Sequence, residues 1–452
     1  MNKIITLTLL LILILPSINL MTTAKQNETY DYVIITTNKI QEGSIKLDDF
    51  IQHKENLGFS VLIVTEDEFN NVQGEPPNKR PEKIRQWLIN NYETMGIKYV
   101  LLIGDPVPET YLWLGFFKQL FVKDYSIPMK VVRDFDVSFH EFPTDFYYAD
   151  LDDWNYNNNR MHGDVEDYEH MDLVPEIYVG RIPVYGTNPF YKYDLSTVDH
   201  ILEKIINYEN EKNPTWRKNI LLPMSFTRIG VEIGTHLAEQ MLDDFLIPRG
   251  FSYWRMYQQG TDYATENSIY DSEEELLDDA VVNRWKDNPY GLVCWMGHGG
   301  PEWVRIGNDL HNGGTLFNAN QIPLLNDSQP SIVFMISCQN GFPENHYNLG
   351  YSLLKQGAIA TISGARTVGG GLNNTYGDFE TCGTSTGIAY RLLNYTSQNY
   401  PLGEALCLVK AELYPDSWFD ADELSDVGKM MWKKELFVFN LYGDPSLRLM
   451  GN

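Results

Sequence analysis

Two apolar stretches decide the fold prediction: residues 291–300 (GLVCWMGHGG) and residues 331–341 (SIVFMISCQNG). Each begins as an apolar run and ends in polar or glycine-rich chain, as a parallel strand does when helices cover both of its faces. His298 follows the first run, and Cys338 follows the second run 40 residues later, which leaves room for one crossover connection. Because the carboxyl ends of parallel strands meet at one edge of a sheet, we expect the imidazole and the thiol to lie together.

Shorter apolar runs extend this pattern over most of the chain. Amphipathic stretches at 83–92, 197–212 and 234–246 lie between some of these runs and predict helices. The alternation predicts an α/β fold, with parallel strands covered by helices on both faces. Asn213-Pro214 breaks the second of these helices, so we place a boundary there between two units, 25–213 and 214–452. The further predicted strands are 32–36 (YVIIT), 60–65 (SVLIVT), 99–104 (YVLLIG), 176–184 (EIYVGRIPV), 218–224 (KNILLPM), 357–363 (GAIATIS) and 436–441.

The charge and the N-terminus restrict the class of protein. The net charge of −26 argues against a nucleic-acid partner, because phosphate binding needs clustered Lys and Arg. Lys3, the apolar run at 4–15 and the small residues at 22–24 give the layout of a secretory signal peptide over residues 1–24. An uncleaved membrane anchor is the alternative, and no later stretch suggests a membrane span. We therefore expect a secreted or cell-surface protein.

His298 and Cys338 are the residue types that nucleophilic catalysis by a thiol needs. A nearby imidazole takes up the thiol proton or stabilises the thiolate. Gly299 allows a close approach of the backbone, and its N–H, together with that of Cys338, is suited to stabilise the oxyanion of a tetrahedral intermediate. A lone histidine or cysteine is more often structural, but here both residues end apolar runs. Cys294 lies inside such a run and is interpreted as a core residue.

These motifs resemble the gingipain family of cysteine peptidases, within the caspase-like clan, where one apolar strand ends in His-Gly and another ends in Cys. The resemblance implies two caspase-like α/β subdomains with parallel sheets and helices on both faces, a supporting one at 25–213 and a catalytic one at 214–452. It covers most of residues 30–450. Stretches that resemble family landmarks, in the same order, are 99–105 (YVLLIGD), 144–148 (TDFYY), 178–184 (YVGRIPV), 338–341 (CQNG) and 441–447 (LYGDPSL).

The resemblance implies a cysteine endopeptidase that cleaves proteins or peptides through a thioester at Cys338 and needs no cofactor for its chemistry. It also implies an acidic residue behind the histidine, for which Glu232 is the candidate, with a solvated charge at a helix start as the alternative. Family members that cut after Arg or Lys hold that side chain with a carboxylate. Asp378 is the candidate here, with an ordinary exposed acid as the alternative. Three other functions stay open: a transpeptidase, a non-catalytic surface binding module and a metal-dependent hydrolase.

Oxygen-bearing side chains alternate along residues 150–159 (DLDDWNYNNN). Alternate spacing lets a loop wrap a hard cation such as calcium. The middle positions are Asn and the turn glycine is missing, so a plain polar loop is the alternative to a structural calcium site. The candidate ligands are Asp150, Asp152, Asp153, Asn155, Asn157 and, closing the loop, Asp164.

Overall fold

The computed structural model of the protein describes residues 28–109, 123–134, 140–159, 162–163, 167, 170–186, 193, 195–227, 232–259, 267–307, 314–369, 375–413 and 434–451. The predicted signal peptide and the candidate ligand Asp164 lie outside these residues. Within them, every helix is too short or too polar to cross a lipid bilayer.

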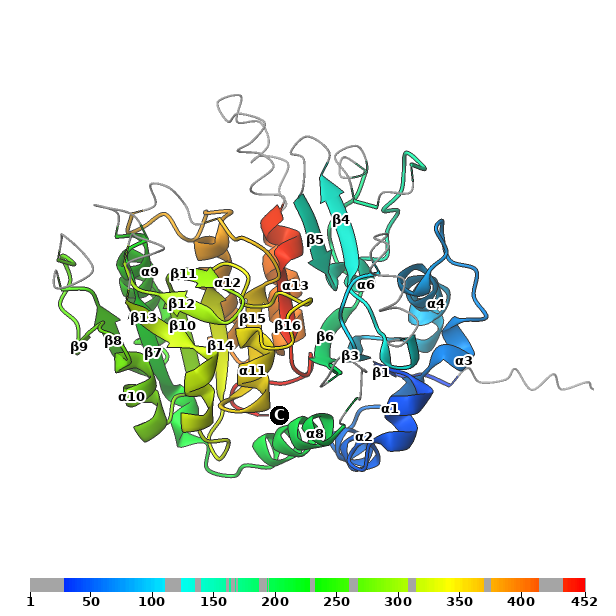
Figure 1. Ribbon diagram of the computed structural model, residues 1–452, viewed down its shortest axis with the longest axis horizontal. Helices are drawn as coiled ribbons and strands as arrows, with labels where there is room; N and C mark the ends of the chain where they lie inside the picture. The colour runs from blue at the N-terminus through cyan, green and yellow to red at the C-terminus, as the bar shows by residue number, and fades with distance from the viewer. Residues whose placement is uncertain are drawn as a thin grey trace, which may run out of the picture.

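One sheet of 11 strands runs through the molecule in the order β2-β1-β3-β6-β16-β15-β14-β10-β7-β8-β9 (Figure 1). All neighbours in it pair in parallel except β15 and β16. Because β16 is antiparallel to β15 but parallel to β6, the strands of the two halves run in opposite directions. The strands are β1 (Tyr32–Ile35), β2 (Val61–Val64), β3 (Tyr99–Gly104), β6 (Tyr178–Pro183), β7 (Asn219–Met224), β8 (Ser252–Tyr257), β9 (Glu274–Glu275), β10 (Leu292–Met296), β14 (Ser331–Ile336), β15 (Ala358–Gly364) and β16 (Phe439–Tyr442).

Alternate residues of the central strands face two separate hydrophobic clusters. In β10, Cys294 belongs to the larger cluster, whereas Val293 and Trp295 belong to the smaller one. Residues of α9 (Ile233–Met241) and α12 (Ser385–Ser397) complete the larger cluster on their side of the sheet. Residues of α10 (Ala280–Asp287), α11 (Leu349–Lys355) and a small sheet, β11 (His298–Gly300), β12 (Trp303–Arg305) and β13 (Thr315–Asn318), complete the other. The predicted α/β fold with helices on both faces is confirmed.

The first half of the chain carries its own helices. Helix α8 lies between the two halves in Figure 1 and packs against both α2 and α11. The other α-helices and strands among the described residues are α1 (Asn38–Gly43), α2 (Leu47–Asn56), α3 (Glu66–Phe69), α4 (Arg80–Met95), α6 (Phe146–Ala149), α8 (Ser196–Glu209), α13 (Leu402–Glu412) and an antiparallel hairpin of β4 (Lys130–Asp134) and β5 (His140–Thr144). Short 3-10 or π helices span η1 (Lys123–Tyr125), η2 (Thr215–Lys218), η3 (Leu242–Leu246) and η4 (Ala319–Leu324).

The joint between the halves is built from the stretches that resemble family landmarks. A Cβ atom on Gly180 would lie 2.5 Å from the carbonyl oxygen of Gly443, so the chain cannot carry a side chain at this crossing. Next to it, the fully buried Arg181 donates from Nε to Asp145 at 2.7 Å. Asp444 accepts a hydrogen bond from Tyr32 Oη at 2.9 Å, which ties the last strand to the first. Since one sheet spans both halves, the division at residue 213 stays a prediction.

Candidate active site

His298 and Cys338 follow two strands that are direct neighbours and in register. Met296 of β10 lies opposite Ile336 of β14, and each reactive residue follows two positions later. The prediction that the two apolar runs form adjacent parallel strands is therefore confirmed. Both residues lie at the same edge of the sheet and are partly exposed.

Gly299 lies directly against Cys338. A Cβ atom at this position would be 2.6 Å from the backbone nitrogen of Cys338 and 2.9 Å from Cβ of Ser337, closer than real side chains pack. The backbone of Gly299 also lowers the pKa of the Cys338 thiol. The absence of a side chain at residue 299 therefore lets the two turns pack together. The role of the Gly299 amide toward a substrate stays a prediction.

The turn after Cys338 is fixed by buried polar contacts. Gln339 has φ = 61°, a left-handed conformation that non-glycine residues rarely adopt. The buried Asn340 donates from its side-chain amide to the carbonyl oxygen of Gly300 at 2.6 Å and contacts the hydroxyl of Ser337. Trp295 in turn donates to that hydroxyl at 3.1 Å. The turn that carries Cys338 and the turn that carries His298 are therefore joined by the side chains of Asn340, Ser337 and Trp295.

The imidazole of His298 is held by backbone. Its Nε2 lies 3.0 Å from the carbonyl oxygen of Thr227, which follows β7. A carbonyl only accepts, so Nε2 carries the proton in this bond and Nδ1 of the neutral ring is the free acceptor. This tautomer is the one that leaves Nδ1 able to take a proton from a thiol.

The surroundings of Cys338 keep its thiol protonated at neutral pH. Burial raises the pKa of Cys338, and the nearby Glu435 acts in the same direction. Hydrogen bonding by the Val368 and Gly299 backbone and the charge of Lys434 lower that pKa but do not offset burial. All four cysteines are free thiols, and Cys338 is the one that is not fully buried. Cys294 has no exposed surface, in agreement with its interpretation as a core residue.

Glu232 lies at the start of α9, with its carboxylate engaged locally. The carboxylate accepts hydrogen bonds from Ser268 Oγ at 2.9 Å, from the Ile269 amide at 3.0 Å and from Thr235 Oγ1 at 3.0 Å. The hydrogen bond that holds His298 is made instead to the carbonyl oxygen of Thr227. A role of Glu232 behind the histidine stays a prediction.

Asp378 lies in an exposed turn that packs near α9. Its carboxylate accepts hydrogen bonds from the amide of Thr375 at 2.8 Å and from the hydroxyl of the same residue at 3.0 Å. These bonds lower the pKa of Asp378, so the group is ionised at neutral pH. The neighbouring Gly377 donates to Gln240 of α9 at 2.8 Å. A charged carboxylate is therefore present in this loop, and its role in binding substrate stays a prediction.

The candidate calcium loop is organised around the buried guanidinium of Arg85. This group donates to the carbonyl oxygens of Tyr147 at 2.9 Å and Asp150 at 3.1 Å, and also contacts that of Asp152. Asp150 accepts from Trp154 Nε1 at 2.9 Å through Oδ1, whereas its Oδ2 is buried and has no partner among the residues that the structure describes.

The other candidate ligands make local contacts. Asp153 accepts from the amide of Asn155 at 2.9 Å, and Asn157 accepts from the amide of Asn159 at 3.0 Å. Across the described residues, the structure does not bring together three His, Cys, Asp or Glu side chains in a metal-binding arrangement. The orphan oxygen of Asp150 fits a cation, but the described carboxylates alone do not form a complete site.

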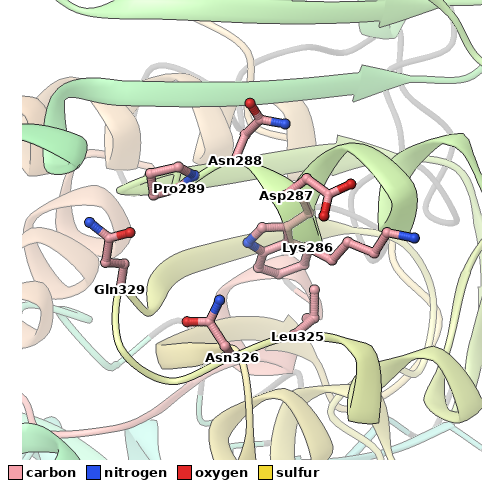
Figure 2. A pocket seen from close by; sticks show the side chains of 8 residues that line it. Lys286, Asp287, Asn288, Pro289, Leu325, Asn326 and Gln329 are labelled. Carbon is pink, nitrogen blue, oxygen red and sulfur yellow. The ribbon is translucent and has the colours of Figure 1, made fainter.

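A separate surface hollow lies at the other end of the strands (Figure 2). Its residues precede β10 and β14, whereas His298 and Cys338 follow these strands. The hollow is therefore not part of the peptidase site. It is lined by Trp285, Lys286, Asp287, Asn288, Pro289, Leu325, Asn326 and Gln329.

Three groups at the site were not assigned from sequence. Thr227 contributes only its backbone carbonyl, so its side chain gives no signal. Asn340 lies inside the stretch 338–341 that resembles a family landmark, and that resemblance was the available signal for it. Glu435 is distant in the chain, and only the fold brings it near Cys338.

Solved structures of known peptidases share this fold. The crystal structure of the Arg-specific cysteine proteinase gingipain R (RgpB) superposes with a TM-score of 0.59 and 17% sequence identity, over 94% of this chain and 79% of that one. The complex of the pro- and mature domains of RgpB from Porphyromonas gingivalis gives a TM-score of 0.58 and 15% identity, over 92% and 79% of the two chains. At this level of identity the likeness shows the fold alone. No curated protein sequence matches the chain.

The sequence profile of peptidase family C25 matches residues 25–450, nearly the whole chain. That match and the shared fold agree with the resemblance drawn from the His-Gly and Cys motifs. The chain therefore belongs to peptidase family C25, the gingipain family, and is a cysteine-type peptidase.

Proposed function

We propose that the protein is a secreted endopeptidase in which Cys338 is the nucleophile and His298 transfers the protons. The observation that carries the proposal is the register of β10 and β14, with Gly299 packed against the Cys338 backbone. A thiol that is protonated at rest needs a base during attack. In the proposed mechanism, Nδ1 of His298 is that base.

The proposed reaction has two halves. The Cys338 sulfur attacks the peptide carbonyl while its proton moves to His298, and the oxyanion accepts hydrogen bonds from the N–H groups of Gly299 and Cys338. His298 then protonates the leaving amine, which leaves a thioester. In the second half water attacks the thioester, His298 takes its proton, and the thiol is released with the carboxylic acid.

We also propose a basic residue on the amino side of the scissile bond. The net charge of −26 favours cationic peptides. Asp378 offers an ionised carboxylate, and the similar structure gingipain R is described as Arg-specific. Secretion remains part of the proposal on the basis of the predicted signal peptide at residues 1–24.

The test is labelling with acyloxymethyl ketones that carry Arg, Lys or norleucine next to the reactive group. We expect the Arg and Lys probes to label the wild type, the norleucine probe to label it weakly, and Cys338→Ala not to be labelled. Cys382→Ala is the matched control, since Cys382 is buried, and should be labelled like the wild type. Labelling that persists in Cys338→Ala would remove the proposed nucleophile. Product masses measured with an added amine distinguish hydrolysis from transpeptidation.

A structural calcium ion in the loop at 150–159 is a separate proposal. One support is Oδ2 of Asp150, which has no hydrogen-bond partner among the described residues. The other is the pair of carboxylates Asp152 and Asp172. Burial raises the pKa of Asp152, and the nearby Asp172 raises it further. Asp150, Asp152, Asp153, Asn155, Asn157 and Asp164 would supply the oxygen ligands. Calcium should raise the melting temperature of the wild type but not of Asp152→Asn, whereas equal shifts in both would reject the site.

A further inference from the structure

Glu435 is a buried acid beside the nucleophile that the proposed reaction does not use. It lies just before β16, with about 1% of its surface exposed. Its Oε1 accepts a hydrogen bond from the Gly369 amide at 2.6 Å. Within the described part of the chain, its Oε2 is buried and has no hydrogen-bond partner. A buried polar atom without a partner costs free energy, so its retention calls for a physical explanation.

The hydrogen bond from Gly369 connects Glu435 to Cys338. The carbonyl oxygen of Gly369 is held by Ser385, which donates from its amide at 3.1 Å and from its hydroxyl at 2.9 Å. The preceding carbonyl, that of Val368, lies 3.8 Å from the Cys338 sulfur. The Val368–Gly369 peptide that contacts the thiol is therefore held by the carboxyl group of Glu435, and the next carbonyl along the chain is held by Ser385.

The charges of Glu435 and Lys434 shift the pKa of the Cys338 thiol in opposite directions. Burial raises the pKa of Glu435 to about 8, although Lys434 and the Gly369 amide lower it in part. The charge of Glu435 raises the pKa of Cys338, whereas the charge of Lys434 lowers it. His298 lies on the neighbouring strand end.

We propose that Glu435 is a positioning residue of the peptidase site, whose buried carboxyl group fixes the Val368–Gly369 backbone against Cys338 and whose charge state governs how readily the thiol ionises. The inference rests on the proposed role of Cys338 as the nucleophile. A neutral Glu435 holds the loop without opposing the thiolate, whereas an ionised Glu435 opposes it.

The test is the rate of Cys338 alkylation by iodoacetamide as a function of pH, in the full chain. Cys338→Ala gives the background from the other cysteines. Glu435→Gln keeps the size of the side chain and the acceptor for Gly369 but removes the charge. We expect its alkylation midpoint to move to lower pH, with alkylation roughly 3- to 10-fold faster than in the wild type at about pH 8. Lys434→Gln should move the midpoint in the opposite direction.

The hydrogen bond is tested by peptide hydrolysis in the same variants. Glu435→Ala should lower kcat by about tenfold or more through the displaced loop, and Glu435→Gln should restore it. Glu412→Gln, at an exposed position of α13, is the control and should match the wild type in both measurements. A Glu435→Gln alkylation profile that superimposes on the wild type would overturn the proposal, and that comparison decides the question even where Glu435→Ala does not fold. Alkylation needs no peptide cleavage, so its outcome is independent of whether the chain hydrolyses the chosen substrate.

Discussion

The side-chain amide of Asn340 donates to the carbonyl oxygen of Gly300 at 2.6 Å and so fastens the turn that follows Cys338 to the turn that carries His298. Asn340 is fully buried. Asn340→Ala would leave the Gly300 carbonyl and the Ser337 hydroxyl without this partner, and we expect a loss of about 2 kcal/mol in the free energy of unfolding. Because the two reactive residues would lose their common anchor, kcat should fall by about 10- to 100-fold with a smaller change in KM.

The control for this prediction is Asn320→Ala. Asn320 is exposed, and we expect a change within about 0.5 kcal/mol and unchanged kinetics. Urea unfolding and steady-state hydrolysis check both variants. If Asn340→Ala lost stability yet kept the wild-type kcat, the link between the turns would be structural and would not position the site.

The central strands could be predicted because both faces of their sheet are buried. In β10 and β14 every residue is buried, so each strand is a continuous apolar run in the sequence. Such a run differs plainly from the mixed polar and apolar pattern of an amphipathic helix. The outer strand β8 was missed for the opposite reason. Its sequence SYWRMY is partly exposed, and Arg255 within it pairs with Glu239 and Glu273 instead of packing in a core.

The last strand, β16, shows a second feature that could not be predicted from the sequence, namely the direction of a strand. The run at 436–441 predicts a strand, but β16 begins only at Phe439 and runs antiparallel to β15. Its direction depends on contacts with the first half, such as the pairing of Tyr442 with Arg181, which are distant in sequence. The same limit applies to the site. Adjacent strand ends could be predicted, whereas the carbonyl of Thr227 and the carboxyl of Glu435 reach the site through tertiary structure alone.

A side chain at position 299 should abolish activity. Gly299→Ala would place a Cβ atom 2.6 Å from the Cys338 amide nitrogen, so the turn that carries Cys338 must move away from the turn that carries His298. We expect kcat/KM to fall by roughly 100-fold or more, as for the loss of an oxyanion donor. Gly96→Ala is the control. Gly96 has φ = 74° with open space around it, so its replacement should cost about 1 kcal/mol in stability and leave kcat unchanged.

The pH dependence of Cys338 should follow from its burial. Burial raises the pKa of the thiol above its ordinary value, so the thiolate fraction is small at neutral pH and grows as pH rises. Alkylation of the wild type by iodoacetamide should therefore increase through the alkaline range, with a midpoint above that ordinary value. A midpoint near or below neutral pH would instead show a resting thiolate paired with a protonated His298, and His298→Ala would then raise it.

The last prediction concerns the buried ion network that joins the halves. Lys54 has no exposed surface and donates to Glu209 at 2.7 Å, and it also pairs with Asp444 after β16. Lys54→Met would leave two buried carboxylates without their cation, and we expect a loss of about 3–5 kcal/mol in the free energy of unfolding. Lys46→Met is the matched control, because Lys46 makes similar pairs at the surface with Asp49 and Glu203, and should cost less than about 1 kcal/mol. Urea unfolding of both variants at neutral pH measures the difference. Equal costs for the two lysines would mean that water reaches the Lys54 network, and that the two halves are held together chiefly by the sheet and the packing around α8.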